Sequence, residues 1–197
     1  LSMRASHVLV AVFVIAALIF AAIGAAMGDT FFLRLATEAL IFAGLALSVD
    51  ILLGYTGLLS LGQALYFGMG AYISALILKE VPSFWTAMGV VLVAALIVGT
   101  IAGLIANRVR GVYFALVTFG LAQVAARAVY NTRSLGASDG LIGVPIVPIH
   151  LGVGTIMSNA PASFFIFTLG FIVILYLASA YVLDTPFGRV LVALRAN

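Results

Sequence analysis

The sequence predicts an all-α, polytopic membrane protein with about six transmembrane helices and a glycine-rich broken or re-entrant segment between spans two and three. Three observations predict this fold class. Hydrophobic residues make up 65% of the 197 residues and charged residues only 8%, whereas soluble domains carry roughly 25% charged residues. The mean hydropathy is +1.32. Uncharged stretches of about 20 residues, the length that spans a bilayer, recur along the chain.

The predicted spans follow one another from the amino terminus. The first, Val8–Met27, is longer than the roughly 7–15 apolar residues of a cleaved signal peptide, although cleavage in its small-residue tail stays a minor alternative. Residues 131–163, with three prolines, predict a long extramembrane or re-entrant loop. The other five spans are expected at Leu35–Leu53, Ala64–Leu78, Thr86–Ala106, Val112–Tyr130 and Phe164–Leu183.

The distribution of Lys and Arg predicts how the spans are oriented in the cell inner (plasma) membrane. The paired Arg108 and Arg110, in a short turn between spans, place that turn and the last segment in the cytoplasm. The predicted inner side then carries Arg4, Arg108, Arg110, Arg189 and Arg195. The outer side carries Arg34, Lys79, Arg127 and Arg133.

The segment Gly54–Gln63 joins spans two and three without a charge, yet it is rich in glycine and small polar residues. Irregular backbone at membrane depth must be buried in protein or line a watery cavity, because lipid cannot hydrogen-bond it. Two interpretations stay open: a broken segment on a translocation route, as in transporters, or a tight hydrophobic turn. The candidate residues of a solute pathway are Gly54, Tyr55, Gly57, Ser60, Gln63 and Tyr72.

Few polar groups lie within the predicted spans. Glu38 follows Arg34 by four residues, which predicts mutual neutralisation on one helix face, and Asp50 precedes the glycine-rich break. Thr118, like Ser60 and Gln63, either contacts a polar solute or, more commonly, hydrogen-bonds a neighbouring helix. Gly99 and Gly103 form a small-xxx-small pair that predicts close packing with another helix.

Several classes of function are excluded by composition. The chain has no Cys, so disulfides, thiolate metal sites and Cys nucleophiles are all absent. Its Lys and Arg are scattered and form no basic patch for nucleic acid. His7 and His150 lie outside the predicted spans, and no cluster of nucleophile, base or metal ligands is evident. We therefore expect no enzyme, no catalytic or metal site and no cofactor.

Residues 184–197 predict a short amphipathic helix after the last span. Thr185 is suited to the N-cap and Pro186 to the first helical position. The apolar residues Phe187, Val190, Leu191 and Leu194 recur at helical spacing, with Arg189 opposite. This helix lies on the inner leaflet or docks into a cytoplasmic partner. The spacing of its apolar residues is compatible with both interpretations.

Three stretches resemble the permease subunits of ABC importers for branched-chain amino acids, in the branch that includes amide and urea permeases. They are LGYTGLLSLGQALYFGMGAY from Leu53, RGVYFALVTFGLAQ from Arg110 with GASDGLIG from Gly136, and TPFGRVLVALRAN from Thr185. The chain departs from the family pattern at Asp50, where Asn is frequent, at Gln63, where His is common, and at Ala196, which replaces an often acidic residue.

The resemblance implies a permease that carries branched-chain amino acids or a related small polar solute into the cytoplasm. Its implied partners are a second, similar permease, two cytoplasmic ATP-binding subunits and a periplasmic solute-binding protein. The chain has no phosphate-binding loop, so its partners must hydrolyse ATP. We expect residues 1–197 to be a single, partial permease domain, truncated within the cytoplasmic coupling segment that begins at residue 184.

Within that segment, the resemblance assigns five residues to coupling with the ATPases. They are Phe187, Gly188, Arg189, Ala193 and Arg195. The alternative function is an ion-coupled secondary transporter, which requires acidic groups within the membrane to carry protons or sodium. Glu38 and Asp50 are the only acidic residues within the predicted spans.

Overall fold

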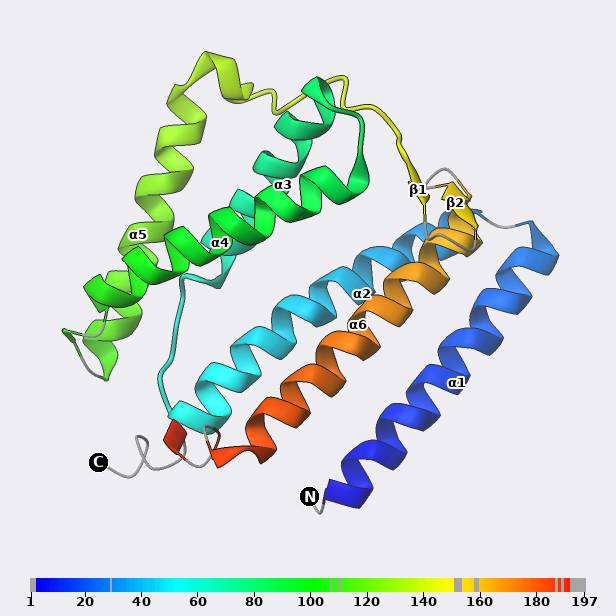
Figure 1. Cartoon of the computed structure of the whole chain (residues 1–197), viewed down its shortest axis with the longest axis horizontal. Coiled ribbons are helices and arrows are strands. Elements are labelled where there is room, and N and C mark those ends of the chain that lie inside the picture. Colours follow the sequence, from blue (N-terminus) through cyan, green and yellow to red (C-terminus); the bar gives the residue numbers. More distant parts are fainter. Residues whose placement is uncertain are drawn as a thin grey trace.

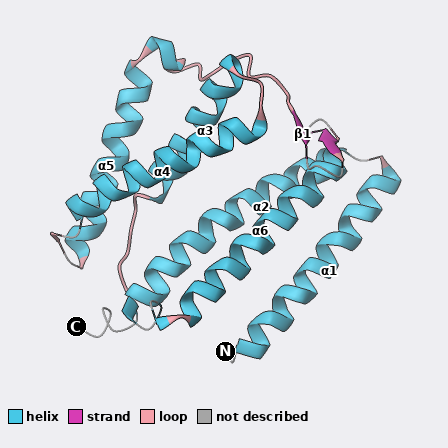
Figure 2. Cartoon of the chain, viewed as in Figure 1, coloured by secondary structure: helices cyan, strands magenta, loops and turns pink. Residues whose placement is uncertain are grey.

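The structure is a computed structural model that describes residues 3–28, 30–106, 108–109, 111–150, 154–157, 160–186, 188 and 190–191. Helices dominate the described part of the chain (Figure 2). The six long helices are α1 (Met3–Met27), α2 (Thr30–Asp50), α3 (Gln63–Glu80), α4 (Phe84–Ala106), α5 (Val112–Asn131) and α6 (Pro161–Asp184). Each coincides with a predicted span, so the all-α fold class is confirmed.

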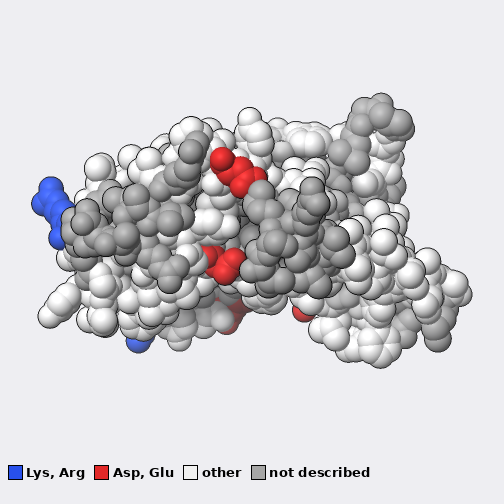
Figure 3. All heavy atoms as spheres, turned by 90° about the horizontal axis from the view of Figure 1, so that it is seen from below, with Lys and Arg blue, Asp and Glu red and all other residues white. Residues whose placement is uncertain are grey.

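Four helical stretches among the described residues are long and apolar enough to cross a membrane. They are Thr30–Thr56, Phe84–Ile105, Val112–Asn131 and Pro161–Asp184. Helix α1 contributes the shorter apolar stretch Val10–Ala26. Large apolar side chains such as Leu96 and Ile174 are exposed, at 72% and 65%. Few of the described residues on the face drawn in Figure 3 are charged. Such a surface is suited to lipid and not to water.

The helices form two groups of three, which Figure 1 shows side by side. In the first group, α1, α2 and α6 pack around a buried apolar core. In the second group, α4 packs against α3 and α5, and α3 also contacts α5. Successive helices run in opposite directions, so the start of α1, the end of α2, the α4–α5 turn and the end of α6 face one side.

Glycine allows the first group to pack closely. A Cβ at Gly24 of α1 would lie 3.1 Å from Leu33 Cγ of α2, and one at Gly44 of α2 would lie 2.8 Å from Ile172 Cδ1 of α6. Small residues at helix crossings bring backbones together, which is how membrane helices gain packing energy without a hydrophobic driving force. The core of this group consists of Ala21, Leu33, Leu40, Phe165 and Leu169.

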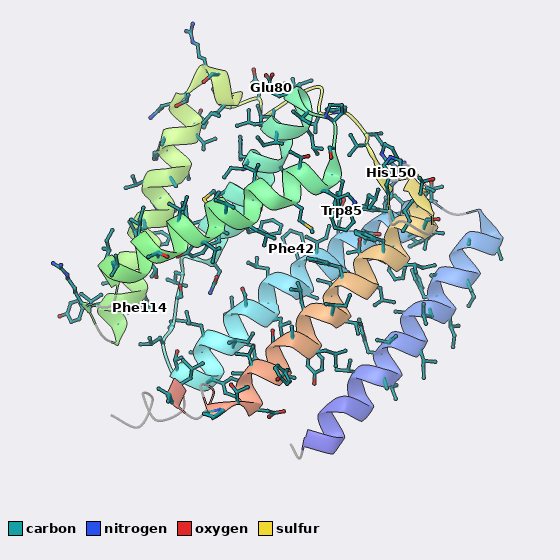
Figure 4. The ribbon with its side chains drawn as sticks, viewed as in Figure 1. Phe42, Glu80, Trp85, Phe114 and His150 are labelled. Atoms are coloured by element: carbon teal, nitrogen blue, oxygen red, sulfur yellow. The ribbon has the colours of Figure 1, made fainter. Side chains whose placement is uncertain are left out.

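A few contacts join the two groups. The rings of Phe42 in α2 and Phe67 in α3 have centroids 5.8 Å apart, and the same distance separates Phe84 of α4 from Phe167 of α6. The Trp85 indole Nε1 donates a hydrogen bond of 2.7 Å to the backbone carbonyl of His150. Figure 4 labels these two residues close to one another.

The long connection between α5 and α6 has regular structure that the sequence did not predict. It contains the 3-10 turn η2 (Arg133–Leu135) and the strands β1 (Pro148–His150) and β2 (Thr155–Met157). The strands pair antiparallel, with Ile149 opposite Ile156. Ile149 is only 2% exposed, so this short hairpin is anchored by an apolar side chain against the ends of the helices.

Candidate functional site

The predicted break between spans two and three lies at residues 57–62. Helix α2 continues as the π-helix η1 (Ile51–Thr56), and Gly57, with φ of 70°, ends it in the left-handed conformation. That conformation costs glycine little because it has no Cβ. The chain then has no regular structure until α3 begins at Gln63. The break starts three residues later than expected, because Gly54 and Tyr55 are accommodated in the wide π turn, a form often found at functional sites.

Hydrogen bonds pair several backbone N–H groups of this irregular segment. The Leu58 N–H donates to Thr56 Oγ1 at 3.4 Å, and the Gly62 N–H donates to Ser60 Oγ at 3.2 Å. The Leu61 N–H donates across the second helix group to Thr118 Oγ1 of α5, at 3.2 Å. Such pairing is what backbone at membrane depth requires, since lipid offers no partners.

Thr118 is the side chain that fixes the broken segment to α5. It is only 8% exposed, and its hydroxyl lies 3.0 Å from both the Phe114 and Ala115 carbonyls, to one of which it donates. Its oxygen remains free to accept the Leu61 N–H. Gly62 makes the approach possible, because a Cβ there would lie 3.1 Å from the Thr118 Cβ and carbonyl oxygen.

A cavity of about 280 Å³ lies between the broken segment and helices α3, α4 and α5. Its lining is mostly apolar, with four polar side chains and no charged one. The lining residues are Leu52, Leu58, Ser60, Gly62, Gln63, Leu65, Tyr66, Ala102, Gly103, Phe114, Thr118 and Leu121. Figure 4 places Phe114 at the beginning of α5, at the end of the second helix group.

The structure brings together only part of the predicted solute pathway. Ser60 and Gln63 line the cavity. Gly54, Tyr55 and Gly57 are not among the lining residues: they shape the helix end that precedes the break. Tyr72 lies within α3, away from the cavity lining.

Sequence patterns alone do not mark the part of the cavity lining that comes from α4 and α5. Ala102, Gly103 and Phe114 lie in apolar stretches that any transmembrane helix could carry. Thr118 was expected to contact a polar solute or to hydrogen-bond a neighbouring helix. Its hydroxyl accepts the Leu61 N–H of the broken segment, 57 positions away, and the same side chain lines the cavity. That partner was not predictable because no local pattern links the two positions.

The segment after α6 begins with a tight turn. Pro186, Gly188, Val190 and Leu191 are helical, and the Gly188 N–H donates to the Thr185 carbonyl at 3.0 Å. The Thr185 hydroxyl donates back to the Val182 carbonyl, at 2.5 Å. Its predicted role as N-cap involves residue 187, which lies outside the described residues.

Gly188 is the coupling candidate whose surroundings the structure describes. It is buried, and a Cβ on it would collide with the Leu183 carbonyl. The other four candidates, Phe187, Arg189, Ala193 and Arg195, lie outside the described residues. Among the described residues, no group of three or more His, Cys, Asp and Glu could hold a metal ion.

Comparison with known proteins identifies the family. The sequence profile of the family described as "Branched-chain amino acid transport system / permease component" matches residues 31–197, most of the chain. No solved structure matches the chain significantly.

Two curated relatives carry the same description. The high-affinity branched-chain amino acid transport system permease protein LivM of Escherichia coli (strain K12) is 31% identical over 113 residues. The LivM protein of Salmonella typhimurium (strain LT2) is 30% identical over 113 residues. Each match covers 56% of this chain and 27% of the relative. The chain is therefore a multi-pass membrane protein that belongs to the family of permease components of branched-chain amino acid transport systems.

Proposed function

We propose that this chain is the membrane-spanning part of a permease subunit of an ABC importer, located in the inner membrane. It carries branched-chain amino acids or a related small polar solute into the cytoplasm, and separate subunits hydrolyse ATP. The observation that carries the proposal is the broken segment at residues 57–62, whose hydrogen-bonded backbone lines a cavity inside the helix bundle. Transporters place solute sites at such interruptions of transmembrane helices.

The order of elements supports a solute route beside this segment. The break follows η1 directly, and the α4–α5 turn faces the same side of the molecule as the end of α2 (Figure 1). The paired Arg108 and Arg110 assign that side to the cytoplasm. In this arrangement the cavity lies toward the cytoplasmic end of the second helix group, where a solute would leave the permease.

The segment after α6 is proposed to couple the permease to its ATPases. It lies at the same side as the α4–α5 turn, and Gly188 closes a turn in which no side chain fits. A short helix held tightly to the end of α6 would pass the movement of a docked ATPase directly to that span. The proposed partners are two ATP-binding subunits, a second similar permease and a periplasmic solute-binding protein.

Reconstitution of the full-length permease with its ATPases and binding protein tests this function. We expect solute-stimulated ATP hydrolysis to fall to the basal rate when Arg189 and Leu194 are both replaced by Ala. We also expect Gly188→Ala to abolish most of the stimulation, since overpacking of this kind costs about 1–3 kcal/mol. Gly170→Ala is the matched control, because a Cβ at Gly170 in α6 meets nothing within 4 Å.

Two results would contradict the proposal. Full stimulation in the Arg189 and Leu194 double variant would remove the coupling role of the segment. Uptake that collapses with an uncoupler but survives ATP depletion would indicate an ion-coupled secondary transporter. The structure does not favour that alternative, because Glu38 and Asp50 are both exposed and neither lines the cavity.

A further inference from the structure

The cavity beside the broken segment has the chemistry of a site for an aliphatic group. Leu52, Leu58, Leu65, Phe114 and Leu121 supply its apolar wall, and no charged side chain lines it. Its volume of about 280 Å³ is slightly below the roughly 300–1,000 Å³ of pockets for drug-sized ligands. A solute smaller than a drug therefore fits it, and an aliphatic portion of that solute gains contact with the leucine side chains.

The polar groups of the cavity divide into two kinds. The hydroxyls of Ser60 and Thr118 already hold the backbone of the broken segment. Within the described part of the chain, the Gln63 amide and the Tyr66 hydroxyl make no hydrogen bond that would occupy them. These two groups, one turn apart at the start of α3, are available to the polar end of a solute whose aliphatic end lies against the leucines.

The wall formed by α4 is made of small residues. Ala102 is 8% exposed, and Gly103 has open space where a side chain would begin, with nothing within 4 Å of an ideal Cβ. Gly103 therefore does not pack against another helix of the described structure, contrary to the expectation from its spacing to Gly99. Its missing side chain leaves volume in the cavity.

We propose that this cavity binds the aliphatic side chain of the transported solute, and that Gly103 sets the largest side chain that passes. This inference rests on the proposed function, because it assumes that the chain carries branched-chain amino acids. It adds a selectivity site within the permease itself, separate from recognition by a solute-binding protein.

A matched pair of variants tests the inference. Gly99 and Gly103 are one turn apart in α4, and a Cβ at either position meets nothing within 4 Å. Only Gly103 is among the residues that line the cavity. Gly103→Val and Gly99→Val therefore change the helix equally, while only the first reduces the cavity.

The measurement is uptake of radiolabelled leucine, isoleucine and valine by the complete transport system, with permease levels in the membrane quantified. We expect Gly103→Val to lower the maximal rate for leucine and isoleucine relative to valine by on the order of tenfold, the effect of one methylene in an apolar pocket. The KM should stay unchanged, because an upstream binding protein captures the solute. Gly99→Val should leave the ratio of rates as in the wild type.

Two outcomes of this comparison would overturn the inference. Equal loss in both variants would show that this face of α4 is a helix-packing face. An unchanged ratio of rates in Gly103→Val would show that the cavity does not contact the side chain of the solute. If Gly103→Val fails to reach the membrane, Gly103→Ala compared with Gly99→Ala must show the same preference, reduced in size. A wild-type system that takes up none of the three amino acids would instead refute branched-chain amino acids as the solute of the proposed function, on which this inference rests.

Discussion

Particular glycines of the two helix groups have opposite effects on packing. In the group of α1, α2 and α6, Gly24 and Gly44 lie against Leu33 and Ile172 of neighbouring helices. In the group of α3, α4 and α5, Gly103 leaves open space beside a cavity. The same residue type therefore allows close crossings at Gly24 and Gly44 and leaves space for a cavity at Gly103. Whether a glycine packs closely or leaves space depends on which neighbour the fold places opposite its missing side chain.

This difference assigns different mechanical roles to the two groups. The first group has a contiguous buried core and close helix crossings, which resist rearrangement because packed interiors do not deform continuously. The second group contains the broken segment and the cavity. We expect conformational changes during transport to take place in the second group, with the first acting as a fixed support.

The largest predicted effect follows from breaking the core of the first group. Phe165 is 2% exposed and its ring lies 6.3 Å from that of Phe20. Phe165→Ala should destabilise the permease by about 3 kcal/mol, the lower end of the range for a buried Phe. The lower end applies because helices that separate in a membrane expose their apolar side chains to lipid and not to water. Phe171→Ala, at a position 45% exposed on the same helix, is the control. Thermal unfolding in detergent measures the stability of both variants. Equal stabilities of Phe165→Ala and Phe171→Ala would contradict the assignment of the first group as a rigid, closely packed support.

A smaller effect should come from releasing the broken segment of the second group. Thr118→Val removes the hydroxyl that accepts the Leu61 N–H, and an unpaired backbone donor costs about 1–3 kcal/mol. Thr118→Val should therefore lower the rate of transport. Thr118→Ser keeps the hydroxyl and should transport at the wild-type rate. Thr100→Val is a further control, because Thr100 bonds only within its own helix, to Leu96.

The readout for Thr118 uses the absence of cysteine from the chain. A single Cys introduced at Leu58, in the cavity lining, is then the one thiol within these 197 residues, and the same protein without it provides the labelling background. We expect Thr118→Val to change the labelling rate at this position, and Thr118→Ser and Thr100→Val to leave it as in the parent protein. Identical labelling in all three backgrounds would show that the hydroxyl does not position the segment.

The smallest effect concerns the bond between α4 of the second group and the strand β1, in the connection that leads to α6 of the first group. Trp85→Phe keeps an aromatic ring but removes the Nε1–H that donates to the His150 carbonyl. Because Trp85 is 46% exposed, the loss should be about 0.5 kcal/mol, the low end for a hydrogen bond. Hydrogen exchange at the strands β1 and β2 should increase while α1, α2 and α6 stay protected. Faster exchange throughout the first group would show that the two groups do not fold as separable units.

The sequence by itself determined the helices and the position of the break. Uncharged stretches of bilayer length specify spans because lipid requires every backbone group to be paired within the segment. Gly54–Gln63 stood out because it combines glycine and polar residues where no charge marks a loop, and the irregular backbone lies at residues 57–62 within it. Both signals are local and depend only on neighbouring residues.

The tertiary structure alone decided which glycines pack and which leave space. Gly24 precedes Gly28, and Gly99 precedes Gly103, at the same four-residue spacing. Of Gly24 and Gly103, only Gly24 has a neighbouring side chain at contact distance. The bond from Leu61 N–H to Thr118, the cavity and the hairpin of β1 and β2 likewise depend on contacts between distant segments. Such contacts follow from how helices cross and not from hydropathy, because one apolar helix face is as suited to lipid as to another helix.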